Sequence, residues 1–167
     1  MPPDSSRETG SASDASAADQ HFRALERLYA SAPINQKFDS RLEIVGQGLS
    51  RLHFNVSETD YHAAGAAHGT VYFKMLDDAA FYAANTLATD RFLLTTSFNL
   101  HFTKPVREGP VTAEGKWVSG KRRVFVAESR LVDAEGDEIG RGTGTFMRSR
   151  IALSSLPGYS PGASGAE

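Results

Sequence analysis

Two residues of one predicted helix have the chemistry to act on a carbonyl group. The helix is expected over Thr70–Leu87, a long stretch of helix formers without Gly or Pro. Asp77 shares an apolar face with Phe73 and Phe81, where a carboxylate is costly unless it has a use. It could activate water as a base or act as a nucleophile. Gly69 begins the helix, where a free N–H stabilises negative charge on an approaching oxygen. Together they suit hydrolysis of a carbonyl compound such as a thioester.

The spacing of these two residues limits how they can work together. Gly69 and Asp77 are eight residues apart, which is about 12 Å along a helix that rises about 1.5 Å per residue. One carbonyl group cannot lie within hydrogen-bond reach, about 3 Å, of both. If both act, they must come from different chains. The sequence therefore predicts a site that is shared across a dimer interface.

Other polar side chains near this helix admit more than one interpretation. His68 is expected to fix the loop before the helix, whereas His62 could either bind the thioester or stabilise that loop. Asp78 lies four residues after Lys74, so an exposed ion pair accounts for it. No spacing of His, Asp or Glu favours a metal site. The chain has no cysteine, which excludes a thiol nucleophile.

The bulk composition is that of an ordinary globular protein. Of 167 residues, 40% are hydrophobic and 23% are charged, and the net charge of −2 gives no electrostatic reason to bind nucleic acid or an anionic membrane. No apolar run approaches the roughly 20 residues that span a bilayer. Residues 1–20 lack the apolar core of a signal peptide. We therefore expect a cytoplasmic protein that uses no metal or separate cofactor.

The chain is predicted to hold one folded domain between two tails. Residues 1–20 are almost entirely small, polar or acidic, and are expected to be disordered. Residues 151–167 are rich in Pro and Gly and are expected to form a flexible C-terminal tail. The folded domain is placed at residues 21–150. It should begin with a short amphipathic helix around Leu25 and Leu28.

Strand patterns flank the long helix on both sides. Alternating apolar residues indicate a hairpin over residues 42–56 and four further strands after the helix. Turns at Ser119–Gly120 and at residues 133–136 join the later strands. We expect these four strands to form an antiparallel meander around the helix. In the first of them, Phe98 should face one side and Thr95 the other.

Three glycines share one face of the last predicted strand. Gly140, Gly142 and Gly144 alternate with other residues there. Glycine weakens a strand, so three in register need a reason, and close approach of a helix backbone is a good one. We therefore expect the long helix to pass over them.

The chain resembles the PaaI-type acyl-CoA thioesterases of the hotdog superfamily in the segment from Asp60 to Asn85, which reads DYHAAGAAHGTVYFKMLDDAAFYAAN. In that family a His-Gly-Gly begins the central helix, and an acidic residue follows at the spacing of His68 to Asp77. The resemblance covers the whole folded domain, including the FTKPV stretch and the glycine-rich last strand. It implies an α+β hotdog fold, a curved antiparallel β-sheet wrapped around one long central helix. It also implies hydrolysis of an acyl-CoA and assembly as a homodimer or homotetramer.

Two positions depart from the family signature. Thr70 stands where the second glycine is usual, and should trim the space beside the substrate. His62 stands six residues before His68, where relatives often carry Asn. The resemblance also gives Thr95 a role, because relatives have a Ser or Thr there that orients water. The alternative for Thr95 is an ordinary strand threonine.

Three consecutive basic residues could bind the substrate, and two other functions remain possible. Lys121, Arg122 and Arg123 lie beside a predicted hairpin turn. They form either a solvated turn or a binding site for the phosphates of coenzyme A. A 3-hydroxyacyl-thioester dehydratase on the same fold could use a His with Asp77. A non-catalytic acyl-CoA-binding protein is the other alternative.

Overall fold

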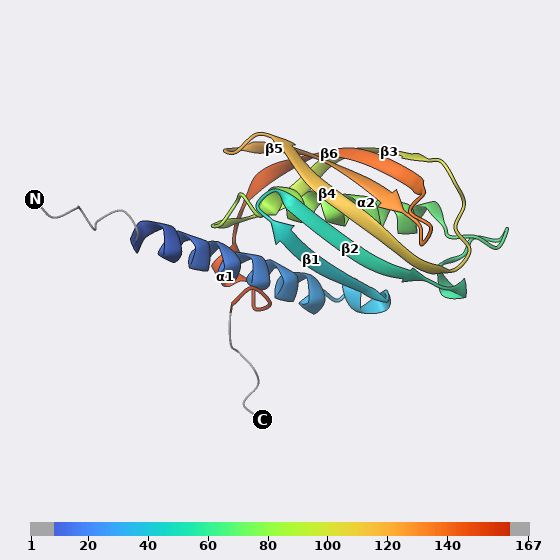
Figure 1. The fold of residues 1–167 in the computed structure, drawn as a ribbon, viewed down its shortest axis with the longest axis horizontal. Coiled ribbons are helices and arrows are strands. Elements are labelled where there is room, and N and C mark those ends of the chain that lie inside the picture. The colour runs from blue at the N-terminus through green and yellow to red at the C-terminus, as the bar shows by residue number, and fades with distance from the viewer. Residues whose placement is uncertain (1–8, 161–167) are drawn as a thin grey trace, which may run out of the picture.

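A six-stranded antiparallel sheet and the helix that it encloses form the body of the protein (Figure 1). The computed structural model describes residues 9–160, and their side chains from residue 15 onward. Its long helices are α1 (Thr9–Ser31) and α2 (Gly69–Asn85), and its strands are β1 (Ser40–Gly46), β2 (Leu49–Val56), β3 (Arg91–Phe102), β4 (Gly109–Ser119), β5 (Val124–Val132) and β6 (Glu138–Ala152). Short 3-10 helices cover Asn35–Lys37, Glu58–Asp60 and Leu153–Ser155. This is the expected α+β hotdog architecture.

The sheet holds α2 against its inner face at very short range. A Cβ atom at Gly115 of β4 would overlap the carbonyl group of Ala79 in α2. Ser50 and Ser129, on the strands to either side, donate hydrogen bonds to the carbonyl oxygens of Ala79 and Leu76 at 2.6 and 2.7 Å. The buried, largely apolar helix that the sequence predicts is confirmed, and its position on the sheet is fixed.

The four later strands do not form the expected meander. The sheet order is β1-β2-β4-β5-β6-β3, so β3 pairs with β6 at one edge and β4 pairs with β2. The chain between β3 and β4 crosses the start of α2, where the Tyr72 hydroxyl donates to the Lys104 carbonyl at 3.0 Å and accepts from the Val106 N–H at 2.9 Å. The meander prediction was wrong for β3 because this crossing carries the chain to the far side of the helix.

The glycines of β6 have a different neighbour from the one predicted. A Cβ atom at Gly142 or Gly144 would overlap the ring of Phe98 on β3, whereas one at Gly140 would meet no atom closer than 3.4 Å. The close approach of the helix backbone occurs at Gly115 instead. The expectation that α2 passes over the β6 glycines is therefore corrected, because the aromatic ring of the neighbouring strand fills that space.

Both predicted tails contain ordered structure near the domain. α1 includes residues 9–20, which the sequence interpretation assigned to a disordered tail, while residues 1–8 lie outside the described residues. His21 on α1 bonds the carbonyl of Asn85 at 3.0 Å and the hydroxyl of Tyr159 at 2.7 Å. Leu153 is fully buried. The predicted C-terminal tail therefore packs on the domain at least to Tyr159, and residues 161–167 lie outside the described part.

The two edges of the sheet differ in their cover. α1 lies along β1, where the Glu26 carboxylate accepts from the Ile44 N–H at 2.7 Å and Arg23 donates to the Ile44 carbonyl at 3.1 Å. At the other edge, β3 has β6 as its only strand neighbour within residues 9–160. A long, uncovered edge strand is a template for pairing with another chain. None of the described helices is long and apolar enough to cross a membrane.

Candidate active site

The structure brings Asp77 together with Thr95, the strand residue to which the family resemblance gave a role. The Thr95 hydroxyl on β3 donates a hydrogen bond to the Asp77 carboxylate on α2 at 3.0 Å. Burial raises the pKa of Asp77 to about 6, although the Thr95 hydrogen bond acts to lower it. A carboxylate with a pKa near the working pH is well suited to accept a proton from water.

A β-bulge explains how Thr95 reaches Asp77. In the register of β3 with β6, Thr95 pairs with Phe146 and Ser97 pairs with Thr145, so Thr96 is an additional residue. The bulge places Thr95 on the same face as the fully buried Phe146, toward α2. Simple alternation had placed Thr95 on the face away from Phe98, and that prediction was wrong. Bulges commonly re-aim a side chain beside a functional site in this way.

Gly69 opens α2 with its backbone N–H available. His68 caps the helix, because its Nδ1 accepts the Thr70 N–H at 3.1 Å and lies 2.9 Å from the Thr70 hydroxyl. No acceptor within residues 9–160 is bonded to the Gly69 N–H. A Cβ atom at Gly69 would lie 3.3 Å from the ring of Phe102. The glycine therefore leaves a narrow approach to an unpaired N–H at a helix N-terminus.

His62 takes part in the loop that leads to this helix. Its Nδ1 accepts the Ala64 N–H at 3.0 Å, and its backbone bonds Ala66 and Gly65, each at 2.9 Å. Gly65 has a φ of 76°, a conformation that favours glycine. These contacts suit the loop-stabilising interpretation of His62. The His62 residue as a whole is exposed.

Asp78 is paired as expected but is not exposed. It forms an ion pair with Lys74, and only 20% and 14% of the two side-chain surfaces are accessible. The Lys74 ammonium also bonds Asn35 at 2.5 Å and lies over the rings of Tyr29 and Phe38. The predicted surface ion pair is corrected to a mostly buried one, because the segment after α1 folds over it.

The two reactive groups are separated within one chain. Gly69 is the first residue of α2 and Asp77 lies at its middle, about 12 Å away. Beside them, the exposed side chains of Phe73, Leu94 and Phe102 lie on or next to the open β3 edge. A single chain therefore presents each half of the candidate site next to an uncovered apolar surface.

The basic cluster lies at the same end of the sheet as Thr95. Lys121, Arg122 and Arg123 are exposed in the β4–β5 turn. The strand residue that follows them, Val124, is linked across β6 to Leu94, the neighbour of Thr95. Among the described side chains none forms an ion pair with these three, although the Lys121 ammonium lies 5.3 Å from the Trp117 ring centre.

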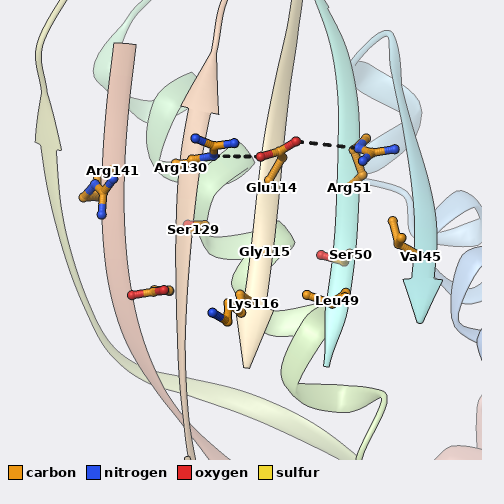
Figure 2. Close-up of a pocket in the computed structure, with 11 residues that line it drawn as sticks. Val45, Leu49, Ser50, Arg51, Glu114, Gly115, Lys116, Ser129, Arg130 and Arg141 are labelled. Atoms are coloured by element: carbon orange, nitrogen blue, oxygen red, sulfur yellow. Dashed lines mark hydrogen bonds and ion pairs between the residues drawn. The ribbon is translucent and has the colours of Figure 1, made fainter. Parts of the chain in front are cut away.

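A separate groove of about 370 Å³ lies on the outer face of the sheet (Figure 2). Arg130 and Arg51 flank Glu114 there, at 2.7 and 3.9 Å, while α2 lies behind the strands. No residue that the sequence selected lines this groove. The sheet separates this groove from Asp77, so it is not part of the candidate active site.

Comparison with known proteins identifies the family. The model of the thioesterase superfamily matches residues 64–139, which include Gly69, Asp77 and Thr95. A protein of Saccharolobus solfataricus named "Putative esterase" is 32% identical over 105 residues, which are 63% of this chain and 70% of that protein. The chain belongs to the thioesterase superfamily.

Solved structures share the fold at low sequence identity. The PaaI protein from the phenylacetic acid degradation operon of E. coli has a TM-score of 0.74 and 14% identity, over 81% of this chain and 98% of that one. A Streptococcus mutans protein solved with bound acetyl-CoA has a TM-score of 0.61 and 17% identity, over 66% and 89% of the two chains. These similarities confirm the hotdog fold.

The Asp77–Thr95 pair leads to a prediction about pH. Because Asp77 must be ionised to act as a base or nucleophile, kcat/KM should rise with pH through about 6 and then level off. Thr95→Val removes the hydrogen bond that lowers the pKa of Asp77, so the midpoint should move to higher pH. Near pH 6, the rate should fall by about tenfold, the usual worth of a hydrogen bond to a charged group. The pH profiles of both proteins provide the measurement, and an unmoved midpoint would contradict the pairing.

Proposed function

We propose that this protein hydrolyses an acyl-CoA to the free acid and coenzyme A. The main support is the Asp77 carboxylate, which has a raised pKa and accepts a hydrogen bond from Thr95. It lies on the same helix that begins with the unpaired Gly69 N–H. Membership of the thioesterase superfamily supports thioester hydrolysis. The bound acetyl-CoA in the similar Streptococcus mutans structure supports a coenzyme A ester as the substrate.

The chemistry follows from these groups. Asp77 either removes a proton from water as water attacks the thioester carbon, or attacks that carbon itself and is released later by water. In both routes the carbonyl oxygen gains negative charge, which the Gly69 N–H at the positive end of α2 stabilises. The carbon–sulfur bond then breaks, and the thiol of coenzyme A leaves with a proton.

The complete site requires two chains in this proposal. β3 of one protomer would pair with β3 of a second copy, because this edge is long, uncovered and flanked by the exposed Leu94 and Phe102. Such pairing would bring Gly69 of one protomer toward Asp77 of the other, which the separation along α2 demands. The homodimer is thus the smallest active unit.

A thiol-release screen tests the proposed function. The full chain is incubated with a panel of saturated acyl-CoAs and with an enoyl-CoA, while free thiol and hydration of the double bond are both followed. A thioesterase releases thiol from esters of both kinds. Hydration without thiol release would instead favour the dehydratase alternative, which the loop and cap contacts of His62 and His68 do not support. No reaction with any ester would refute the proposal.

The basic turn provides a prediction about coenzyme A recognition. Arg122 and Arg123 are exposed and carry charges that suit phosphates. Replacing both with Ala should raise KM roughly three- to tenfold and leave kcat nearly unchanged, because such contacts are equal in the ground and transition states. The increase should shrink as salt rises, since exposed charges are screened beyond about 10 Å at 0.1 M.

A truncated substrate is the matched control for this double variant. A thioester without the nucleotide should be hydrolysed equally by the variant and the parent. Unchanged KM for full acyl-CoA at low salt would show that the turn is only solvated. Lys104 is a poor alternative site for the phosphates of coenzyme A, because its ammonium already pairs with Asp133 and Asp137 at 2.7 and 3.2 Å.

A further inference from the structure

An aromatic pair lies next to the Asp77–Thr95 contact in the register of β3 and along α2. Phe98 follows Thr95 by three residues on β3, and the bulge between them leaves both facing α2. The Phe98 ring lies 5.6 Å from the Phe73 ring, centre to centre, at 75°. Phe73 is one helical turn before Asp77 and is 42% exposed. An apolar wall of two rings therefore stands next to the candidate reactive carboxylate.

The glycines decide how deep the Phe98 ring lies. Phe98 pairs in register with Gly144, and its ring covers both Gly144 and Gly142, with no room for a Cβ atom at either position. Two glycines in one strand weaken it, yet here they let the ring lie flat on the strand backbone. A ring lowered in this way stays against β6, while the Phe73 ring meets it edge-on from α2. A methyl group on the strand would lift the Phe98 ring toward Phe73.

We propose that Phe98, seated on Gly142 and Gly144 and faced by Phe73, is the wall that limits the size of the acyl group at Asp77. This inference rests on the proposed acyl-CoA hydrolysis and adds the determinant of its chain-length preference. The acyl chain lies against apolar surface, as expected for the group that follows the thioester carbonyl. Each methylene that such a pocket admits or excludes changes kcat/KM by about 10- to 200-fold.

Two substitutions should shift this preference in opposite directions. Phe98→Ala removes the wall, so the ratio of kcat/KM for long over short acyl-CoA should rise at least about tenfold. Gly142→Ala lifts the ring off β6 toward Phe73, so the same ratio should fall by about tenfold. The measurement is kcat/KM over straight-chain acyl-CoAs from acetyl to dodecanoyl. A ratio is used because it cancels any loss of active protein.

The chain offers a matched control and a second-site test. Gly140→Ala adds the same methyl group on the same strand, but its nearest neighbour would be 3.4 Å away, so the ratio should stay unchanged. In the Phe98→Ala background, Gly142→Ala should have almost no further effect, because the ring that it displaces is gone. If Phe98→Ala does not fold, Phe98→Leu should give a smaller shift of the same sign.

The possible outcomes separate this inference from the function on which it rests. If the parent hydrolyses acyl-CoAs but the Phe98 and Gly142 variants leave its chain-length profile unchanged, or shift it in the same direction, the wall is refuted and the function stands. Additive effects in the double variant would also refute it. A parent that releases thiol from no acyl-CoA would overturn both.

Discussion

Asp77→Asn is expected to lower turnover of acyl-CoA by about 10²–10⁴, the usual contribution of a general base. The amide keeps the shape of the side chain and can still accept the Thr95 hydrogen bond, but it neither accepts a proton from water nor attacks the thioester. Initial rates of thiol release at pH 8 measure the loss. A decrease of less than about tenfold would contradict the assignment of Asp77.

Stability measurements separate this loss from unfolding. The folded-state pKa of Asp77 is raised from 3.8 to about 6, so the folded chain binds this proton more tightly than the unfolded chain does. The contribution of Asp77 to stability is therefore highest below about pH 4 and declines as pH rises toward 6. Asp77→Asn removes the cost of burying a charge. At pH 8 its melting temperature should equal or exceed that of the parent.

Asp78→Asn is the matched control on the neighbouring residue. It leaves the ammonium of Lys74 without its carboxylate in a mostly buried position, so it should cost about 1–3 kcal/mol of unfolding free energy. The turnover of the folded fraction should fall far less than in Asp77→Asn. A greater loss of turnover at Asp78 than at Asp77 would reverse the two roles.

An equal mixture of two inactive variants, after random reassembly into dimers, should recover about a quarter of the activity of the unsubstituted protein. Gly69→Val blocks the approach to the helix N-terminus, where Phe102 is already near, and Asp77→Asn removes the acid. After unfolding and random reassembly of an equal mixture, half of the dimers are mixed, and each holds one intact site of two. The shared site follows from the roughly 12 Å between Gly69 and Asp77 on one helix.

Each variant reassembled with itself is the control for this experiment, and it should stay inactive. Size-exclusion chromatography and light scattering confirm that dimers have formed. Reassembled mixed dimers without any recovered activity would show that Gly69 and Asp77 do not complete one site between two chains. Activity in a separated monomer would lead to the same conclusion.

The sequence by itself determined the elements that have strong local patterns. The run without Gly or Pro from Thr70 to Leu87 predicted α2 to within two residues, because helix formers and apolar residues continue through it. Alternation and turn residues located all six strands. The distance between Gly69 and Asp77 also followed from sequence, since the rise of a helix is constant.

Tertiary structure alone decided which surfaces these elements share. β3 lies at the edge because the β3–β4 connection crosses α2, where the Tyr72 hydroxyl bonds that connection. The periodicity of the strands does not predict this crossing. The bulge at Thr96 reversed the facing of Thr95 by inserting one residue that no Gly or Pro marks. Because side chains alternate with a period of two, that one residue moved Thr95 from the outer face to Asp77.

The same limit applies to burial and to the glycines. The spacing of Lys74 and Asp78 predicted an ion pair on the surface. In the structure, Asn35, Tyr29 and Phe38, which are distant in sequence, contact the Lys74 ammonium and bury the pair. The sequence showed that the β6 glycines need a close neighbour, yet not that this neighbour is Phe98. A glycine in the sequence shows only that no side chain is present at that position. The packing of other strands determines which group fills the space.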